Sequence, residues 1–140
     1  MSKFSCTWKL SNCLDTAITD FQEEGYNFLS ISGPSRVAGN FSEVFFSRGC
    51  PYDFSMLWSF AISEVLRLTM YCRIFCDNYI YFGIGFTPAD VPANHTLLCT
   101  LGQMPPATDV WMMLKNRSDI PLELFVTHGN FLVRGHMTNG

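Results

Sequence analysis

Apolar and polar residues alternate along the middle of the chain. From Tyr52 to Ile62 every second residue is apolar, and most residues between them are small or polar. Successive side chains of a β-strand point to opposite faces of the sheet, whereas a helix would scatter the apolar set around its axis. This segment is therefore predicted to be a strand with one core face and one small, mostly polar face.

The alternation continues in the next two segments. Val65 to Cys76 forms a second alternating run, and Ser63–Glu64 is predicted to be the turn that joins the two long antiparallel strands. Tyr79 to Phe86 forms a third run, in which Gly83 and Gly85 predict a bulge or a close approach of the backbone. Three long adjacent strands indicate an antiparallel sheet.

Further strands are shorter and are separated by proline and glycine. His128–Gly129 is predicted to form a tight hairpin, because glycine accepts the positive φ that such a turn requires. One short helix is predicted at Ser11–Glu24, capped by Asp15 or Thr16. The shorter strands are predicted at Tyr26–Ile31, Val37–Phe46, Thr96–Leu101, Val110–Leu114, Leu122–Thr127 and Asn130–Arg134.

This pattern predicts an all-β fold, an antiparallel β-sandwich of jelly-roll type with about 8–10 strands. The length of 140 residues fits a single domain over residues 1–140, with residues 1–25 as an irregular or short helical N-terminal segment. A chain of this size buries enough surface to fold without a disulfide or a metal.

Composition bears on the partners of the protein. Only 15% of residues are charged, against about 25% in typical domains, and 13 residues are Phe. Apolar surface left over from the core indicates an oligomer, although a Phe-rich core explains the composition equally well. The net charge is -3 and the nine Lys and Arg residues are scattered, which argues against a nucleic-acid partner.

The sequence shows no signal peptide and no apolar run of about 18 residues, so we expect synthesis in a cytoplasm without membrane insertion. The three N-x-S/T triplets, at Asn40, Asn94 and Asn116, are therefore interpreted as chance. The thiols are expected to be mostly reduced and buried. They belong to Cys6, Cys13, Cys50, Cys72, Cys76 and Cys99.

Cysteine and histidine offer two candidate sites. Cys72 and Cys76 have a spacing that zinc allows, but a second pair is missing, and in a strand their Cα atoms lie about 13 Å apart, too far for a disulfide. Core filling is preferred for both. His95 and Cys99 could form a thiol–imidazole pair, but a buried Cys beside an exposed His is favoured over a catalytic pair.

Other reactive patterns are missing from the sequence. There is no phosphate-binding glycine loop, no G-x-S-x-G motif, and no metal-type spacing among His95, His128 and His136. We expect no enzyme activity, no metal and no cofactor.

Two further kinds of candidate binding site are acidic residues in predicted turns and two exposed loops. Asp77, Asp90 and Asp109 fall in predicted turns and could line a calcium site, although no EF-hand spacing supports one. The loops Asp90–Thr96 and Gln103–Thr108 are better candidates for recognition, because binding residues concentrate on loops held by a rigid scaffold. No individual receptor-binding residue is predicted.

The C-terminal half, from about residue 64 to residue 140, carries a family resemblance. It contains Val91–Pro106 (VPANHTLLCTLGQMPP), then the strand at Val110–Leu114, then a hairpin at Leu122–Gly135 (LELFVTHGNFLVRG). This order resembles the C-terminal heads of phage tail fibres and related viral attachment proteins, with Gly102 and Pro105 as departures from their usual pattern. The resemblance implies a trimeric β-sandwich head that binds a host-surface receptor.

We therefore expect a non-enzymatic viral or phage attachment head on the virion surface, trimeric and recognising a host glycan or protein. The alternatives are a structural virion protein, such as a capsid or baseplate jelly roll, and a lectin-like or cytokine-like binding module. An enzyme on a jelly-roll frame is the least favoured, since no set of residues supports it.

Overall fold

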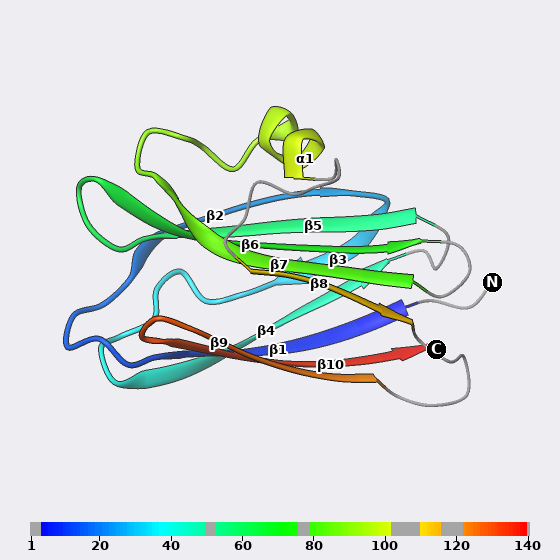
Figure 1. The fold of residues 1–140 in the computed structure, drawn as a ribbon, viewed down its shortest axis with the longest axis horizontal. Coiled ribbons are helices and arrows are strands. Elements are labelled where there is room, and N and C mark those ends of the chain that lie inside the picture. The colour runs from blue at the N-terminus through cyan, green and yellow to red at the C-terminus, as the bar shows by residue number, and fades with distance from the viewer. Residues whose placement is uncertain (1–3, 50–52, 76–78, 102–109, 116–121, 140) are drawn as a thin grey trace.

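A computed structural model describes residues 4–49, 53–75, 79–101, 110–115 and 122–139. In these residues ten strands form two antiparallel five-stranded sheets that pack face to face (Figure 1). The predicted all-β sandwich is therefore confirmed. Sheet A has the strand order β3 (Phe28–Ser32), β4 (Phe41–Gly49), β1 (Phe4–Asn12), β10 (Phe131–Asn139) and β9 (Leu122–His128). Sheet B has the order β2 (Thr19–Tyr26), β5 (Asp53–Ala61), β6 (Leu66–Phe75), β7 (Tyr79–Pro88) and β8 (Val110–Lys115).

The three long alternating runs form the centre of sheet B. Ser63–Glu64 lies in the turn between β5 and β6, as predicted. β6 and β7 pair in continuous register, with Tyr71 opposite Gly83 and Thr69 opposite Gly85. The pairing of β6 with β7 therefore has no bulge at these two glycines, and the other predicted explanation, a close approach of the backbone, stays a prediction. The hairpin of β9 and β10 turns at Gly129, whose φ is +57°.

Large aromatic side chains fill the space between the sheets. Trp8 of sheet A lies 5.3 Å from Trp58 and 5.3 Å from Phe82 of sheet B, measured between ring centroids. Phe45 contacts Trp58 at 5.2 Å with its edge. Burial of each such side chain stabilises the fold by about 1.5–3 kcal/mol. The face of β5 predicted to be apolar supplies Met56, Trp58 and Phe60 to this core.

Residues 4–25 differ from the prediction. They are not an irregular or short helical segment, because β1 is the central strand of sheet A and the predicted helix at Ser11–Glu24 does not form. The chain turns after β1 around Asn12, whose buried side-chain amide donates to the carbonyls of Thr16 (2.9 Å) and Val37 (3.2 Å). An Asx turn replaces the expected helix cap.

Two predicted strands have different bounds, for a reason seen in the backbone. Asn27 has a φ of 58° and divides the predicted Tyr26–Ile31 strand into the end of β2 and the start of β3. Asn40 has a φ of 61° and delays β4 to Phe41, so Val37 makes only an isolated bridge with Ile18. Asparagine tolerates this left-handed conformation better than other residues with a side chain.

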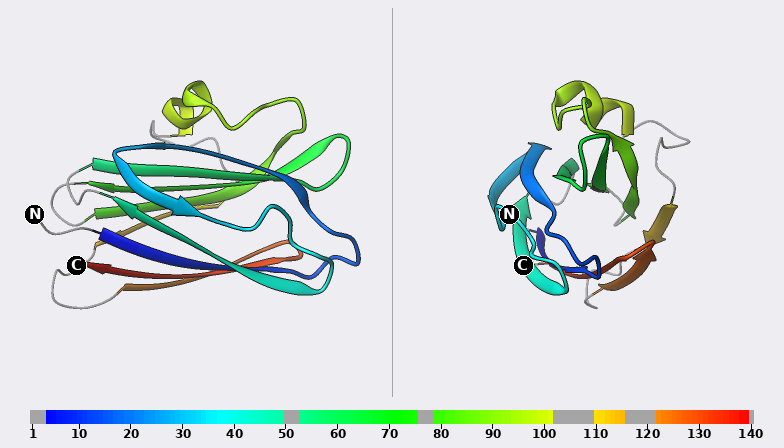
Figure 2. Two further views of the ribbon diagram at one scale, coloured as in Figure 1. Left: turned by 180° about the vertical axis from the view of Figure 1, so that it is seen from behind. Right: turned by 90° about the vertical axis from the view of Figure 1, so that its left-hand side faces the viewer.

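The predicted strand Thr96–Leu101 is a helix, α1 (His95–Leu101). Asn94 caps its first turn, with its side-chain oxygen accepting from the Leu97 amide at 2.9 Å. Leu98 and Leu101 of the helix are buried against Leu57 and Tyr71 on the outer face of sheet B. The helix therefore forms a third layer over sheet B, on the side away from sheet A (Figures 1 and 2).

No helix in the described ranges is long and apolar enough to cross a membrane.

Candidate functional site

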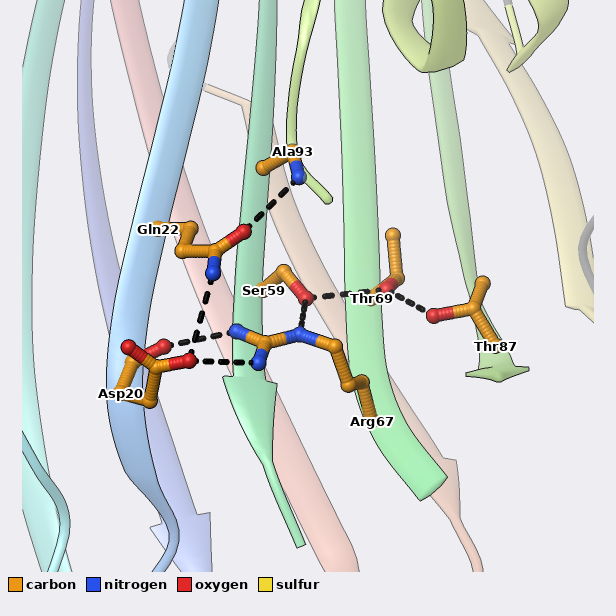
Figure 3. Close-up of polar contacts among 7 residues, drawn as sticks. All are labelled: Asp20, Gln22, Ser59, Arg67, Thr69, Thr87 and Ala93. Atoms are coloured by element: carbon orange, nitrogen blue, oxygen red, sulfur yellow. Dashed lines mark hydrogen bonds and ion pairs between the residues drawn. The ribbon is translucent and has the colours of Figure 1, made fainter. Parts of the chain in front are cut away.

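A buried polar network lies on the outer face of sheet B (Figure 3). Arg67, only 2% exposed, donates from Nε to Ser59 Oγ at 2.7 Å, from Nη1 to Asp20 Oδ2 at 2.9 Å and from Nη2 to the Asp20 carbonyl at 2.6 Å. The hydroxyl of Thr69 continues the network to Ser59 (3.3 Å) and to Thr87 (2.8 Å). Ser59, on the polar face predicted for β5, is thus buried and hydrogen-bonded within the fold.

The same network anchors the edge strand and the segment before α1. Asp20 has a φ of 52° and lies where the pairing of β2 and β5 shifts, between Thr19 and Gln22. Gln22 donates to the Asp20 carboxylate at 3.2 Å and accepts from the Ala93 amide at 2.9 Å. The network thus joins β2, β5, β6 and β7 to one another. Nothing in the sequence links Arg67 to Asp20, because the fold alone brings them together.

His95 and Cys99 do meet, contrary to expectation. They lie one turn apart on α1 with Nε2 and Sγ separated by 3.4 Å, and both side chains are exposed, so the expected burial of Cys99 is wrong. Within the described ranges no group of three or more His, Cys, Asp or Glu side chains could hold a metal ion. Among the described residues the pair therefore lacks the further ligand that a metal site uses.

The remaining described thiols fall into two classes. Cys6 and Cys72 are fully buried and free, which agrees with the expected core role of Cys72, while Cys13 is free and exposed. Burial raises the pKa of the Cys6 thiol to about 12. Burial, with a smaller contribution from Cys6, also raises the pKa of Cys72 well above its ordinary value. Cys76 and Cys50 lie outside the described residues.

These raised pKa values predict loss of stability in alkali. Above the ordinary thiol pKa of 9.0 the unfolded chain releases protons that the folded chain retains up to about 12. The free energy of unfolding should therefore fall as pH rises through this window, by up to about 1.4 kcal/mol per pH unit for each buried thiol. Urea unfolding between pH 8 and pH 10.5 under reducing conditions measures this slope. Cys6→Ala should flatten it, while the exposed control Cys13→Ala should not; equal slopes in all three proteins would contradict the prediction.

Part of the predicted recognition loop Asp90–Thr96 packs on the outer face of sheet B. Ala93 packs against the cluster of Leu57 and Tyr71, while Asp90 and Asn94 are exposed and line a shallow hollow of about 330 Å³ with α1. Asp90 has no group of acidic neighbours suited to calcium in the part of the chain that the structure describes. Asp77, Asp109 and the second loop, Gln103–Thr108, lie outside it.

The outer face of sheet A has a different character. One row of side chains crosses four strands, because β1 pairs Lys9 with Val44 on β4 and with Arg134 on β10, which in turn pairs with Phe125 on β9. All four side chains are exposed; Val44 and Phe125 each have 57% of their surface exposed. The Arg134 guanidinium lies over the Phe125 ring, 5.4 Å from its centroid.

A small hollow lies along this row. Its volume is about 160 Å³, and its walls are Lys9, Ser11, Phe125, Leu132 and Arg134. The hydroxyl of Ser11 lies 2.7 Å from the hydroxyl of Ser42 on the neighbouring strand. The hollow therefore combines two cations, an aromatic ring, an aliphatic side chain and a hydroxyl group. Local sequence signals could not reveal it, since its residues come from both ends of the chain.

Cationic residues gather on this face. Lys9, Arg134 and Arg48 share it by the alternation of β1, β4 and β10. Glu123 of β9 is paired opposite His136 in the same register, and neither Lys9 nor Arg134 forms an ion pair with a carboxylate among the described residues. We identify the outer face of sheet A as the candidate binding surface.

Comparison with models of known families, with curated proteins and with solved structures finds no match to this chain.

Proposed function

We propose that this chain is a non-enzymatic attachment head, a trimeric β-sandwich that recognises a host-surface glycan or protein through the outer face of sheet A. A virion surface is the corresponding location. The resemblance of the C-terminal half to viral and phage attachment heads and the all-β sandwich are both consistent with this proposal.

The observation that carries the proposal is the contrast between the two outer faces. Part of the outer face of sheet B is covered by α1, and the polar groups beside that part bond one another. The outer face of sheet A exposes Val44 and Phe125 beside cations that have no acidic partner among the described residues. A rigid sheet that exposes mixed apolar and charged side chains is suited to binding, because it requires little ordering when a ligand arrives.

Exposed apolar residues also support self-association. Phe41 is 65% exposed at the start of β4, and Tyr26 is 50% exposed at the end of β2. A threefold assembly uses two different surfaces of each subunit, so such residues could pack against a neighbour while another part of sheet A stays open. Burial of these side chains would also account for the low proportion of charged residues.

Solution mass and ligand binding test the two parts of the proposal. Light scattering after size exclusion, with and without reductant, should give a trimer that reductant does not change. The parent protein should bind on a glycan array or a panel of cell surfaces, and the Phe125→Glu variant should not. Val65→Glu is the matched control, since Val65 is 76% exposed in the turn between β5 and β6, away from sheet A. A monomer contradicts the trimer, and equal binding by both variants contradicts the recognition surface.

A further inference from the structure

We infer that the hollow between Lys9 and Arg134 binds the acidic group of a glycan, a carboxylate or a sulfate carried on a single sugar residue. The inference rests on the proposed function and deepens it, because it names the class of ligand and the residues that select it.

The first reason is an unfavourable arrangement of charge. Lys9 and Arg134 are direct cross-strand partners on an exposed face, and like charges in this position destabilise a sheet. Neither side chain forms an ion pair with any described carboxylate. A local cost that the fold does not offset is typical of binding sites. A bound anion would remove the repulsion by contacting both cations.

The second reason is the geometry of the donors. The guanidinium of Arg134 is restrained by the Phe125 ring at 5.4 Å, so less side-chain freedom is lost when it binds. A planar guanidinium can donate two parallel hydrogen bonds to a carboxylate or a sulfate, and the Lys9 ammonium adds a second charge from the adjacent strand. The two cations can thus hold one oxyanion from two sides.

The third reason is the size and lining of the hollow. Its volume of about 160 Å³ is below the roughly 300–1,000 Å³ of pockets that hold drug-sized ligands, so the hollow suits a single acidic sugar residue, with the rest of a glycan outside it. Leu132 offers an apolar wall, and the Ser11–Ser42 hydroxyl pair at the rim can exchange hydrogen bonds with sugar hydroxyls.

The strand order argues against an acidic peptide. Extended peptides commonly bind by adding a strand to an open sheet edge. Lys9 and Arg134 lie on β1 and β10, and each of these strands is paired on both sides. A ligand in this hollow can therefore contact side chains but cannot form backbone hydrogen bonds with β1 or β10. This suits a compact acidic sugar better than an extended peptide.

The test compares acidic and neutral ligands on the full chain. Titration calorimetry with 3′-sialyllactose, 3′-sulfolactose and lactose should show at least one acidic ligand binding ten-fold or more tightly than lactose, with affinity falling as salt increases. Lys9→Gln and Arg134→Gln, which keep most of each side chain, should each weaken acidic binding about ten-fold without lowering the melting temperature, because each removes one of two repelling charges. Arg36→Gln, which removes an exposed cation outside sheet A, should bind like the parent.

Each other outcome has a definite meaning. Equal binding of lactose, or unchanged affinity in both glutamine variants, overturns the inference but leaves an attachment head intact. If parent chain instead binds phosphatidylserine vesicles or poly-glutamate through Lys9 and Arg134 and no acidic sugar, the glycan assignment is overturned. If none of the three sugars binds but Phe125→Glu still abolishes binding to the cell-surface panel, only the inference is overturned. If Phe125→Glu has no effect on that binding either, the proposed function is overturned as well.

Discussion

Asp20→Asn is expected to lower the free energy of unfolding by about 1.5–3 kcal/mol, the range for a hydrogen bond to a charged group, because only the arginine of this ion pair is buried. The Arg67 side chain is only 3% exposed, whereas that of Asp20 is 63% exposed. Loss of the carboxylate charge leaves the buried guanidinium without a counter-charge. Water cannot compensate for this loss, because it does not reach the guanidinium. Asparagine is the informative substitution, because it tolerates the φ of 52° at this position.

The double variant separates the orphaned charge from general damage to the edge of sheet B. Arg67→Met removes the buried cation, so Asp20→Asn should cost much less in an Arg67→Met background than in the parent. Urea unfolding of the four proteins gives this coupling energy directly. Arg36→Met, at an exposed cation, serves as the control and should change stability by less than about 0.5 kcal/mol. Additive effects of the two substitutions would show that the ion pair contributes nothing specific.

Gly135→Ala is expected to destabilise the protein by about 3 kcal/mol through overpacking. Gly135 is buried opposite Trp8, and a Cβ atom there would lie 2.6 Å from Cζ3 and 2.8 Å from Cε3 of the indole. Trp8 cannot move away easily, because Trp58 and Phe82 hold it from the other sheet. Glycine is required here for close approach, not for an unusual backbone angle.

The partner substitution again provides the test. Trp8→Phe removes the distal atoms of the indole and should itself cost stability, since Trp8 is only 1% exposed. In that background Gly135→Ala should be tolerated much better, and chemical denaturation should show a coupling energy above about 1 kcal/mol. An equal penalty in both backgrounds would mean that the alanine acts elsewhere than on the indole.

The sequence predicted sheet B better than sheet A, for a physical reason. β5 to β7 follow one another along the chain and pair as neighbours, so their long alternation and their turns specify the sheet locally. β1 also alternates, with Cys6, Trp8 and Leu10 facing the core, but its partners β4 and β10 are distant in sequence. Asn12 then forms a turn with the same kind of side-chain bond that caps a helix, which explains the wrong helix prediction.

The candidate site could not be predicted because it depends on strand order. Val44, Lys9, Arg134 and Phe125 form one row only after four strands adopt their pairing. Along the chain each of them looks like an ordinary outward-facing residue of a strand. The helix α1 was missed because seven residues with several leucines fit either element, and only the cover they provide over Leu57 and Tyr71 favours the helix.

The pairing of β1 with β10 has a consequence for how the protein is made. The two strands pair along their whole length, from Phe4 opposite Asn139 to Asn12 opposite Phe131, so the start of β1 and the end of β10 lie at one end of the sandwich (Figure 2). During synthesis β1 cannot complete its pairing until β10 has left the ribosome. Until then Trp8 lacks its cover from Gly135 of β10. Contacts so distant in sequence form slowly and expose the growing chain to aggregation. The binding of chaperones to the growing chain should therefore depend more on when the nine residues of β10 emerge than on the long hairpins before it.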